Sequence, residues 1–218
     1  MCAVIPQQSS LFAEPLHEAF APGAWLLRGC ALTDAADLVA AIDAVVEVAP
    51  FRNVMTPFGK PMSVAMSNCG AVGWVSDRSG YRCEANDPER AAPWPAMPRV
   101  FAALAARAAA AAGYPGFAPD ACLINRYVPG ALMTLHQDRD GRDFAQPIVS
   151  VSLGLPAVFL FGGRTRTDRT IKLPLQHGDV VAWGGPSRRW FHGIRPLRDG
   201  EHVLLGRQRL IRTFRVAR

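Results

Sequence analysis

Apolar residues recur with a helical period in two segments of the N-terminal half. One amphipathic helix is predicted from Thr33 or Asp34, either of which can cap it, to about Val48. A second helix is predicted from Pro98 to about Ala112, because a proline opens it, alanines fill it and a glycine follows it. The first twenty or so residues carry no such period and are predicted to be irregular.

Beyond Pro119 the period changes to short apolar runs separated by glycines and prolines, which is typical of antiparallel strands. An earlier short strand is predicted at residues 23–28. The later runs predicted as strands are residues 122–127, 147–153, 158–161, 170–175, 180–183, 190–194 and 207–215. Two helices that precede a β-rich half predict an α+β fold whose strands form a barrel or a jelly roll.

Residues 50–95 fit neither pattern. Proline, glycine, serine and asparagine alternate there with tryptophan, tyrosine and methionine, and no helical or strand period is sustained. A segment of this length without regular structure is usually either disordered or functional. Its aromatic residues and methionines favour the functional interpretation.

Length and charge narrow the class of protein. A chain of 218 residues is long enough for one well-cored domain, and we expect a single domain. Its 24 lysines and arginines exceed its 18 acidic residues, for a formal net charge of +6. This excess suits a nucleic-acid partner, whose phosphates attract basic side chains, but many soluble proteins carry the same charge without that role.

The cysteines and the apolar runs indicate the compartment. The five cysteines are widely spaced and include no CxxC pair, which argues against a disulfide framework or a zinc knuckle and favours a reducing cytosol. No run approaches the roughly 18 apolar residues of a membrane span. The N-terminal sequence lacks the basic start of a secretory signal. The sequence predicts a cytoplasmic protein that does not bind membranes.

A histidine and an aspartate two residues apart form the first candidate for chemistry. On a strand, His136 and Asp138 point to the same face, so that both can bind one metal ion. His192 is the best candidate for a third ligand, whereas His177 suits a turn. Two histidines and one carboxylate leave open positions on the metal, which is the ligand set of non-haem Fe(II) oxygenases. Alternatively, His136 is a strand-end histidine that bonds a neighbouring Asp138.

The C-terminal strand provides a second candidate. Its period of two places Arg207, Arg209 and Arg215 on one face. If that face points into a barrel, the guanidinium groups require an anionic partner, and a dicarboxylate such as 2-oxoglutarate supplies one. The alternatives are an exposed edge strand whose charge resists aggregation and a tail that contacts phosphates.

Several multi-residue runs resemble bacterial AlkB proteins, over about residues 20–216. These runs are residues 50–52, 62–70, 93–98, 120–127, 135–138, 148–156 and 177–181. The resemblance implies a double-stranded β-helix, which is a jelly roll, over about residues 120–216. It also implies flanking N-terminal helices and a nucleotide-recognition lid over about residues 50–95.

The resemblance also implies the cofactor site. Fe(II) would be held by His136, Asp138 and His192. The cosubstrate 2-oxoglutarate would be contacted by Asn125, Tyr127, Arg209 and Arg215, with Trp183 and Ser187 nearby. Arg215 is expected to pair with its distal carboxylate and Arg209 to meet the end nearer the metal. Two residues after the arginine that matches Arg209, the family carries an asparagine, whereas this chain has Ile211. We therefore expect weaker or altered cosubstrate binding.

Members of that family use 2-oxoglutarate and O₂ to hydroxylate a methyl group on a damaged base. The methyl group leaves as formaldehyde, and succinate and CO₂ are released. The resemblance implies substrates of the 1-methyladenine and 3-methylcytosine type in alkylated DNA, preferably single-stranded, with RNA as a second candidate. We expect a monomer, since nothing in the sequence requires more. An AlkB-like hydroxylase acting on RNA, protein or a small molecule, and a non-catalytic nucleic-acid-binding barrel, are the alternatives.

A base must leave the duplex stack to be oxidised, so the sequence must also supply a base pocket. The resemblance places Trp74 on the damaged base opposite His136, and Asp140 at the base edge, where a carboxylate favours a cationic methylated base. The substrate-binding residues it implies are Thr56, Met66, Trp74, Tyr81, Asp140 and Arg166. Of these, Thr56 and Tyr81 are expected to contact phosphates, Arg166 to hold the strand from a hairpin turn, and Met66, with Met133, to line the pocket.

Overall fold

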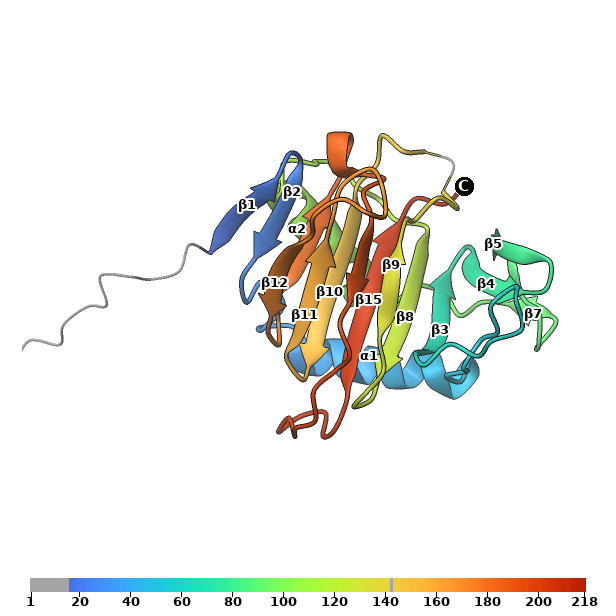
Figure 1. The fold of residues 1–218 in the computed structure, drawn as a ribbon. Helices are drawn as coiled ribbons and strands as arrows, with labels where there is room; N and C mark the ends of the chain where they lie inside the picture. The colour runs from blue at the N-terminus through green and yellow to red at the C-terminus, as the bar shows by residue number, and fades with distance from the viewer. Residues whose placement is uncertain (1–15, 142) are drawn as a thin grey trace, which may run out of the picture.

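The computed structural model describes residues 16–141 and 143–218, and its centre is a seven-stranded antiparallel sheet (Figure 1). In spatial order this major sheet consists of β1 (His17–Ala21), β2 (Ala24–Leu27), β13 (Val180–Trp183), β10 (Ile148–Gly154), β15 (Arg209–Arg215), β8 (Ala121–Tyr127) and β3 (Ala65–Gly70). Residues 1–15, which include Cys2, lie outside the described residues, so the predicted irregularity is only partly tested. Just after them, residues 17–21 form a strand, β1, so the predicted irregularity of the first twenty or so residues is wrong there.

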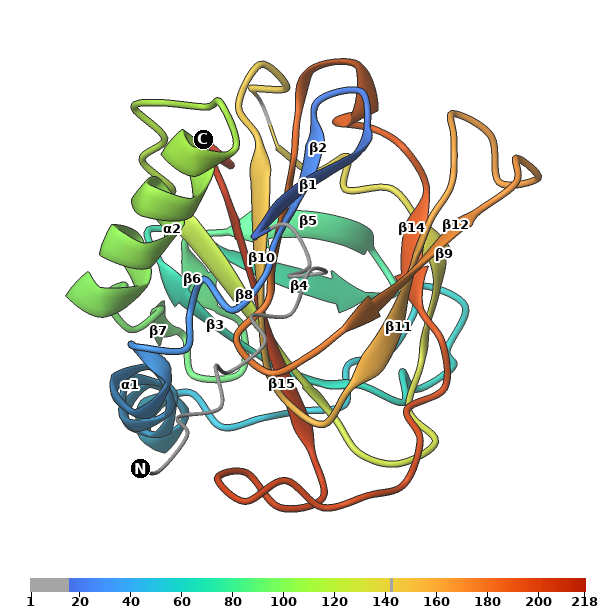
Figure 2. The same cartoon turned by 90° about the vertical axis from the view of Figure 1, so that its left-hand side faces the viewer.

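A smaller, four-stranded sheet packs against one face of the major sheet (Figure 2). In spatial order this minor sheet consists of β12 (Ile171–Leu175), β11 (Ala157–Phe161), β14 (His192–Ile194) and β9 (Met133–His136). Large apolar side chains fill the space between the two sheets, among them Phe159, Phe161 and Trp183. Two antiparallel sheets packed face to face form the jelly roll that the sequence predicts.

Two helices, α1 (Ala35–Val48) and α2 (Arg99–Ala111), cover the other face of the major sheet (Figure 2). Their apolar faces form a second core, in which Leu38 and Ile42 of α1 and Phe101 of α2 are buried. The predicted bounds are confirmed to within a residue or two. Asp34 stands at the N-terminus of α1 without a capping bond from its side chain, which pairs with Arg107 instead.

The segment 50–95 is more regular than predicted. It contains β3 and a hairpin of β4 (Gly73–Asp77) and β5 (Gly80–Glu84), followed by the short strands β6 (Asn86–Asp87) and β7 (Ala92–Pro93). Small polar residues concealed β3, because Asn68 and Ser67 are buried and use their side chains on backbone groups. The side chain of Asn68 bonds both the N–H and the C=O of Trp74, which ties the hairpin to the major sheet.

The later strands are found close to their predicted positions. Two begin two residues later than expected, β14 at His192 and β15 at Arg209. The strand β9 was not predicted, because the sequence pattern did not separate it from the loop that follows. The predicted turn at His177 is confirmed by Gly178, whose φ of +85° suits a residue without a side chain. A 3₁₀-helix, η1 (Gly185–Ser187), follows β13.

Two sequence-based exclusions concern cysteines and membranes. The described cysteines, Cys30, Cys69, Cys83 and Cys122, are all free thiols, as expected. No helix within the described ranges is both long and apolar enough to cross a lipid bilayer.

Candidate metal centre and substrate cavity

His136, Asp138 and His192 converge as the sequence predicts. Each offers one ligand atom, and these three atoms lie within 4.8 Å of one another. The Asp138 carboxylate stands between the imidazoles, with Oδ1 3.8 Å from His136 Nε2 and Oδ2 3.8 Å from His192 Nε2. Two imidazole nitrogens and one carboxylate oxygen at this spacing can bind one metal ion from one side.

The pairing of β9 with β14 sets the spacing of the two histidines, because His136 and His192 are direct cross-strand partners. Gly193 permits this pairing, since a Cβ atom there would lie 2.6 Å from the Met133 carbonyl oxygen. Asp138 follows the end of β9, so the expectation that both HxD residues lie on a strand is wrong for Asp138. The chain still turns its carboxylate toward the histidines.

Backbone carbonyls orient both imidazoles for metal binding. Nδ1 of His136 lies 2.9 Å from the Thr134 carbonyl oxygen, and Nδ1 of His192 lies 3.0 Å from that of Trp190. A neutral imidazole that donates its Nδ1–H to a carbonyl keeps the lone pair on Nε2. The Nε2 atoms are those that face Asp138, so the donor set fits a divalent transition metal.

Charge and burial keep Asp138 and His192 in the protonation states that metal binding requires. Burial alone would raise the pKa of Asp138, but the Arg215 guanidinium and the two histidines lower it to about 2. Burial, followed by the proximity of His136, lowers the pKa of His192 to about 4. At neutral pH, Asp138 is therefore an anion and His192 is neutral.

The three groups face a cavity of about 740 Å³ that lies between the two sheets and the β4–β5 hairpin. Every residue that the sequence predicted for the site lines this cavity except Arg209 and Ser187. Met133 also lines it, as expected. Ser187, which the resemblance implies near 2-oxoglutarate, lies on η1, where its hydroxyl donates to the Pro22 carbonyl oxygen.

The two arginines of β15 lie at different depths, in the reverse of the predicted order. Nη1 of Arg215 is 3.8 Å from Asp138 Oδ1, so Arg215 is the arginine beside the metal ligands. Arg209 is fully buried farther along β15 and donates to the Leu155 carbonyl oxygen and the Ser152 hydroxyl, each at 2.6 Å. Arg207 precedes the strand and pairs with Asp199 at the surface, so its predicted place beside them is wrong.

Buried polar atoms at the floor of the cavity lack hydrogen-bond partners among the described residues. They are Asn125 Oδ1, Trp183 Nε1, and Nε and Nη1 of Arg215. Nearly all buried polar atoms in proteins are hydrogen-bonded, so these atoms fit a polar, anionic ligand that bonds them. Ile211 lies directly across from Asn125 in the pairing of β15 with β8 and adds an apolar side chain to the same floor.

Sequence reasoning missed Arg188, which holds the backbone of the loop that carries the metal ligand Asp138. Its buried guanidinium donates to the Asp138 carbonyl oxygen at 3.1 Å and to that of Gln146 at 2.9 Å, which fixes the loop that carries Asp138. Nothing in the pattern of Ser187–Trp190 distinguishes this arginine from a surface residue. Ser150 and Thr213 of the major sheet also line the cavity and were not predicted.

The outer wall of the cavity comes from the β4–β5 hairpin. The rings of Trp74 and Tyr81 stack with centroids 5.5 Å apart and an angle of 16° between their planes. Trp74 Nε1 donates to Asp140 Oδ2 at 2.8 Å. The three predicted substrate residues of this region therefore form one connected group in the cavity that the metal ligands also line.

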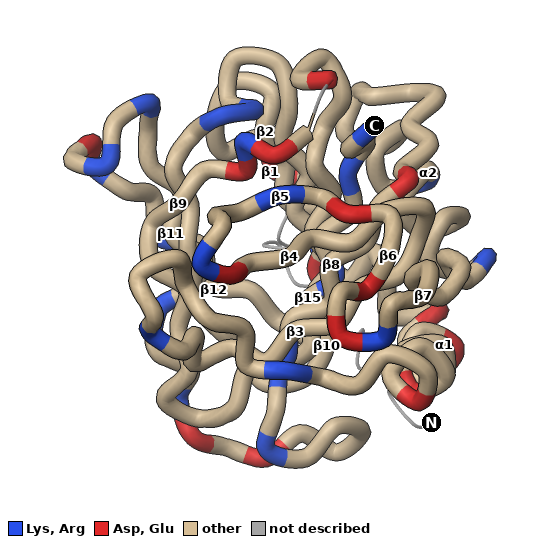
Figure 3. Tube along the Cα trace, turned by 90° about the vertical axis from the view of Figure 1, so that its right-hand side faces the viewer, with Lys and Arg blue, Asp and Glu red and all other residues tan. Residues whose placement is uncertain are grey.

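Arg166 and Thr56 lie at the rim of the cavity. Arg166 is exposed on the loop between β11 and β12, where it bonds the Leu135 carbonyl oxygen and lies 5.1 Å from the Phe191 ring. Basic segments gather on the side of β9, β11 and β12, whereas acidic ones gather near β6, β7 and α1 (Figure 3). The arginine-rich loop thus adds positive charge at the cavity entrance.

Comparison with known proteins agrees with this geometry. Residues 23–215 match the family model of the 2OG-Fe(II) oxygenase superfamily. The chain is 55% identical over 205 residues to the alpha-ketoglutarate-dependent dioxygenase AlkB of Escherichia coli K12, covering 94% of this chain and 95% of the relative. It is 40% identical over 88 residues to the Arabidopsis thaliana DNA N(6)-methyladenine demethylase ALKBH1C, covering 38% of this chain and 19% of the relative. The solved structure of OsALKBH1 superposes with a TM-score of 0.81 at 26% identity, covering 92% of this chain and 99% of that one.

Proposed function

The chain belongs to the 2OG-Fe(II) oxygenase superfamily and, within it, to the bacterial AlkB family, and from this premise we propose that it repairs DNA by oxidative dealkylation of damaged bases. It is a dioxygenase that depends on Fe(II), 2-oxoglutarate and O₂. Its relatives act on nucleic acids. The proposed substrates are bases of the 1-methyladenine and 3-methylcytosine type, in single-stranded DNA in preference to duplex DNA.

One observation carries the proposal: the metal-ligand triad and the stacked pair of Trp74 and Tyr81 line one and the same cavity. A base that enters between them contacts the Trp74 ring on one side and His136 on the other. Its alkyl group then points toward the open face of the triad. This arrangement suits a flipped base, which is usually held by stacking between flat side chains.

In the proposed site the triad holds Fe(II), and Arg215 and Asn125 bind 2-oxoglutarate, with Arg209 at its far end. The bound iron and cosubstrate supply the oxidising equivalent that hydroxylates the alkyl carbon. The carboxylate of Asp140 favours a methylated base that carries a positive charge over its neutral parent. The apolar wall of Met66, Met133 and Phe159 keeps bulk water from this space.

The lid over about residues 50–95 and the catalytic core over about residues 120–216 are proposed as parts of a single domain. Because β3 is a strand of the major sheet, the recognition part of the lid is its β4–β5 hairpin together with the loop that carries Thr56. We propose a monomer that acts in the cytoplasm. RNA that carries the same lesions is a second candidate substrate.

Succinate release from 2-oxoglutarate tests the proposal. The protein is incubated with Fe(II), 2-oxoglutarate and ascorbate, and with oligonucleotides that carry 1-methyladenine, 3-methylcytosine or no lesion. We expect methylated single-stranded DNA to raise succinate release and to yield the unmodified base and formaldehyde in equal amounts. Parallel reactions with duplex DNA and RNA rank the substrates.

The same assay separates the proposal from its alternatives. Turnover raised by a protein or a metabolite, but not by any methylated oligonucleotide, would refute a role in DNA repair. Oligonucleotide binding without succinate release would indicate a non-catalytic binding protein. Arg166→Ala is expected to weaken oligonucleotide binding while 2-oxoglutarate turnover without DNA stays unchanged, because Arg166 is an exposed side chain that is neither a metal ligand nor a proposed contact of 2-oxoglutarate.

A further inference from the structure

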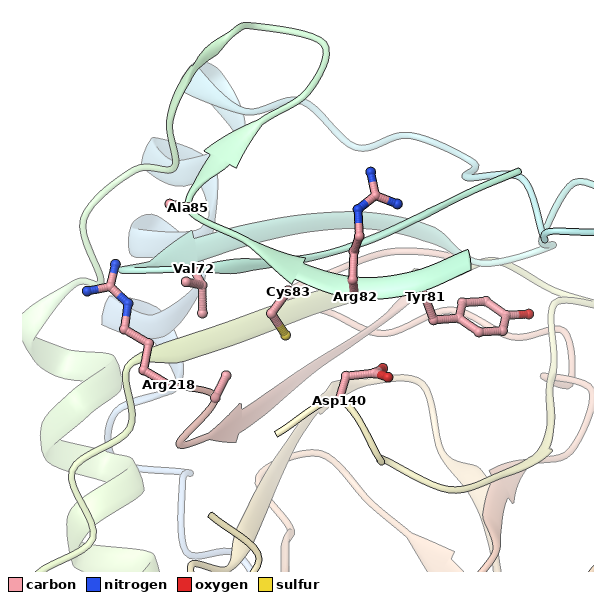
Figure 4. Close-up of a pocket in the computed structure, with 8 residues that line it drawn as sticks. Val72, Tyr81, Arg82, Cys83, Ala85, Asp140 and Arg218 are labelled. Carbon is pink, nitrogen blue, oxygen red and sulfur yellow. The ribbon is translucent and has the colours of Figure 1, made fainter. Parts of the chain in front are cut away.

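A second cavity of about 540 Å³ adjoins the substrate cavity (Figure 4). It lies between β5 and the residues that follow β15, and its size falls in the range of small-ligand sites. Tyr81 and Asp140 line both cavities. The two spaces are therefore neighbours that share one wall.

That wall is held in place by its own contacts. Trp74 stacks on Tyr81 and donates to Asp140, so the three side chains support one another. Tyr81 is nonetheless 45% exposed, and it lines both cavities. A polymer strand that extends from the substrate cavity into the second cavity would pass over the Tyr81 side chain.

The second cavity has an apolar floor and a cationic rim. Val72 and Ala217 form a small buried cluster against which Cys83 packs, and the three side chains provide the floor. Arg218 stands at the rim, where its guanidinium donates to the Ala71 carbonyl oxygen and forms no ion pair within the described part of the chain. Arg82 extends from the opposite face of β5 and is held by Asp77 and Glu84 (Figure 4).

These properties match one nucleotide of a single strand. A base has flat apolar faces that suit the floor, and its phosphate suits a guanidinium at the rim. We propose that the second cavity binds the nucleotide that adjoins the flipped base, with the shared phosphate over Tyr81 and the neighbouring phosphate at Arg218. This inference rests on the proposed function, because the flipped base must first occupy the substrate cavity.

The test compares three trinucleotides that carry a central 1-methyladenine. One has thymine on both sides, and each of the others has an abasic residue on one side, so that every phosphate is kept and only a flanking base is lost. For the unsubstituted protein we expect kcat/KM to fall about fivefold or more for one abasic trinucleotide, because stacking and apolar contacts of a bound base are lost. The other abasic trinucleotide is expected to react like the parent.

Ala85→Trp provides the decisive variant. Ala85 is exposed and lines the second cavity, so an indole there fills the space without disturbing the core. We expect this variant to lose the preference, so that the parent and the abasic trinucleotides react equally. Ala110→Trp, on the exposed face of α2, adds the same bulk elsewhere and is expected to keep the preference.

Charge at the rim is tested separately. Arg218→Glu is expected to raise KM for the parent trinucleotide severalfold, and Arg198→Glu, an equal charge change on the exposed connection between β14 and β15, is expected to leave it unchanged. Equal rates for all three trinucleotides with the unsubstituted protein, or an unchanged preference in Ala85→Trp, would overturn the subsite while leaving base dealkylation intact. Failure of every trinucleotide to react would overturn the proposed function as well.

Discussion

Arg212 is a buried charged residue of the major sheet. Its replacement tests how much a buried charge costs in the core between this sheet and the two helices. It lies on β15 with no exposed surface, on the face opposite to Arg209 and Arg215. None of its three side-chain nitrogens has a hydrogen-bond partner among the described residues, and the ring of Phe101 lies 5.3 Å from its guanidinium carbon. Burial lowers the pKa of Arg212 to about 10, although the thiols of Cys122 and Cys69 raise it in part.

The expected change in the free energy of unfolding follows from the lowered pKa of Arg212 and from its contact with the Phe101 ring. The lowered pKa corresponds to a cost of about 3 kcal/mol for keeping the guanidinium charged in the folded state. The contact with Phe101 offsets about 1 kcal/mol of that cost. We therefore predict that Arg212→Met increases the free energy of unfolding by about 2 kcal/mol, as is typical when well-packed apolar side chains replace buried ions. In a protein of this size the melting temperature should rise by about 4–8 °C.

Urea unfolding at pH 7, followed by tryptophan fluorescence and circular dichroism, measures this change. Arg212→Lys is the matched control, because it keeps a buried charge and should not be more stable than the unsubstituted protein. Turnover of 2-oxoglutarate should be unaffected in Arg212→Met, since this side chain points away from the substrate cavity. A decrease of 1 kcal/mol or more in the stability of Arg212→Met would refute the reasoning, because it would mean that the guanidinium has a strong favourable partner.

Three further predictions concern the site. Asp138→Ala should abolish iron-dependent turnover, measured as succinate release, because it removes both a ligand and the anion that two imidazoles share; near-normal activity would contradict the ligand assignment. Arg209→Met should raise KM for 2-oxoglutarate about a hundredfold while Fe(II) affinity, measured by titration, stays the same; an unchanged KM would exclude Arg209 from the cosubstrate site. In the metal-free protein, the pKa of His192 is about 4, below the roughly 6.5 of an unfolded histidine, so the unfolded chain takes up a proton first as the pH falls. Stability should therefore decrease between about pH 6.5 and pH 4, by at most about 3 kcal/mol, and urea titrations at pH 7 and pH 5 should show that His192→Gln lacks this decrease.

The sequence predicts most of the elements because their apolar periods are local. The two helices and most later strands bury one face, and the resulting spacing of apolar residues can be recognised without knowing which element packs against that face. β3 was missed for the opposite reason, since Ser67 and Asn68 are buried polar residues whose bonds to Ala49 and Trp74 exist only after folding. Hydrogen bonds that buried polar side chains form with distant residues produce no periodic pattern of apolar positions in the sequence.

The residues of the site could be predicted from the sequence, but their distances from the metal ligands could not. His136, Asp138 and His192 were found from the chemistry of their spacing, and most other residues were found through a family resemblance. The order of Arg209 and Arg215 relative to the metal was wrong, because strand alternation gives the face of a side chain and not its distance from a group on another sheet. Arg188 was missed since its partner is a backbone carbonyl, which any residue type carries.

The division of the site between the two sheets has a mechanical consequence. The histidines belong to the minor sheet and Arg209 and Arg215 to the major one, so the spacing of the two sheets sets how the metal ligands lie relative to these two guanidinium groups. Phe159 and Trp183 act as spacers across this gap, with ring centroids 6.0 Å apart. A smaller side chain at either position should therefore shift the metal ligands relative to the guanidinium groups, and so lower turnover, while every ligand and guanidinium group is still present.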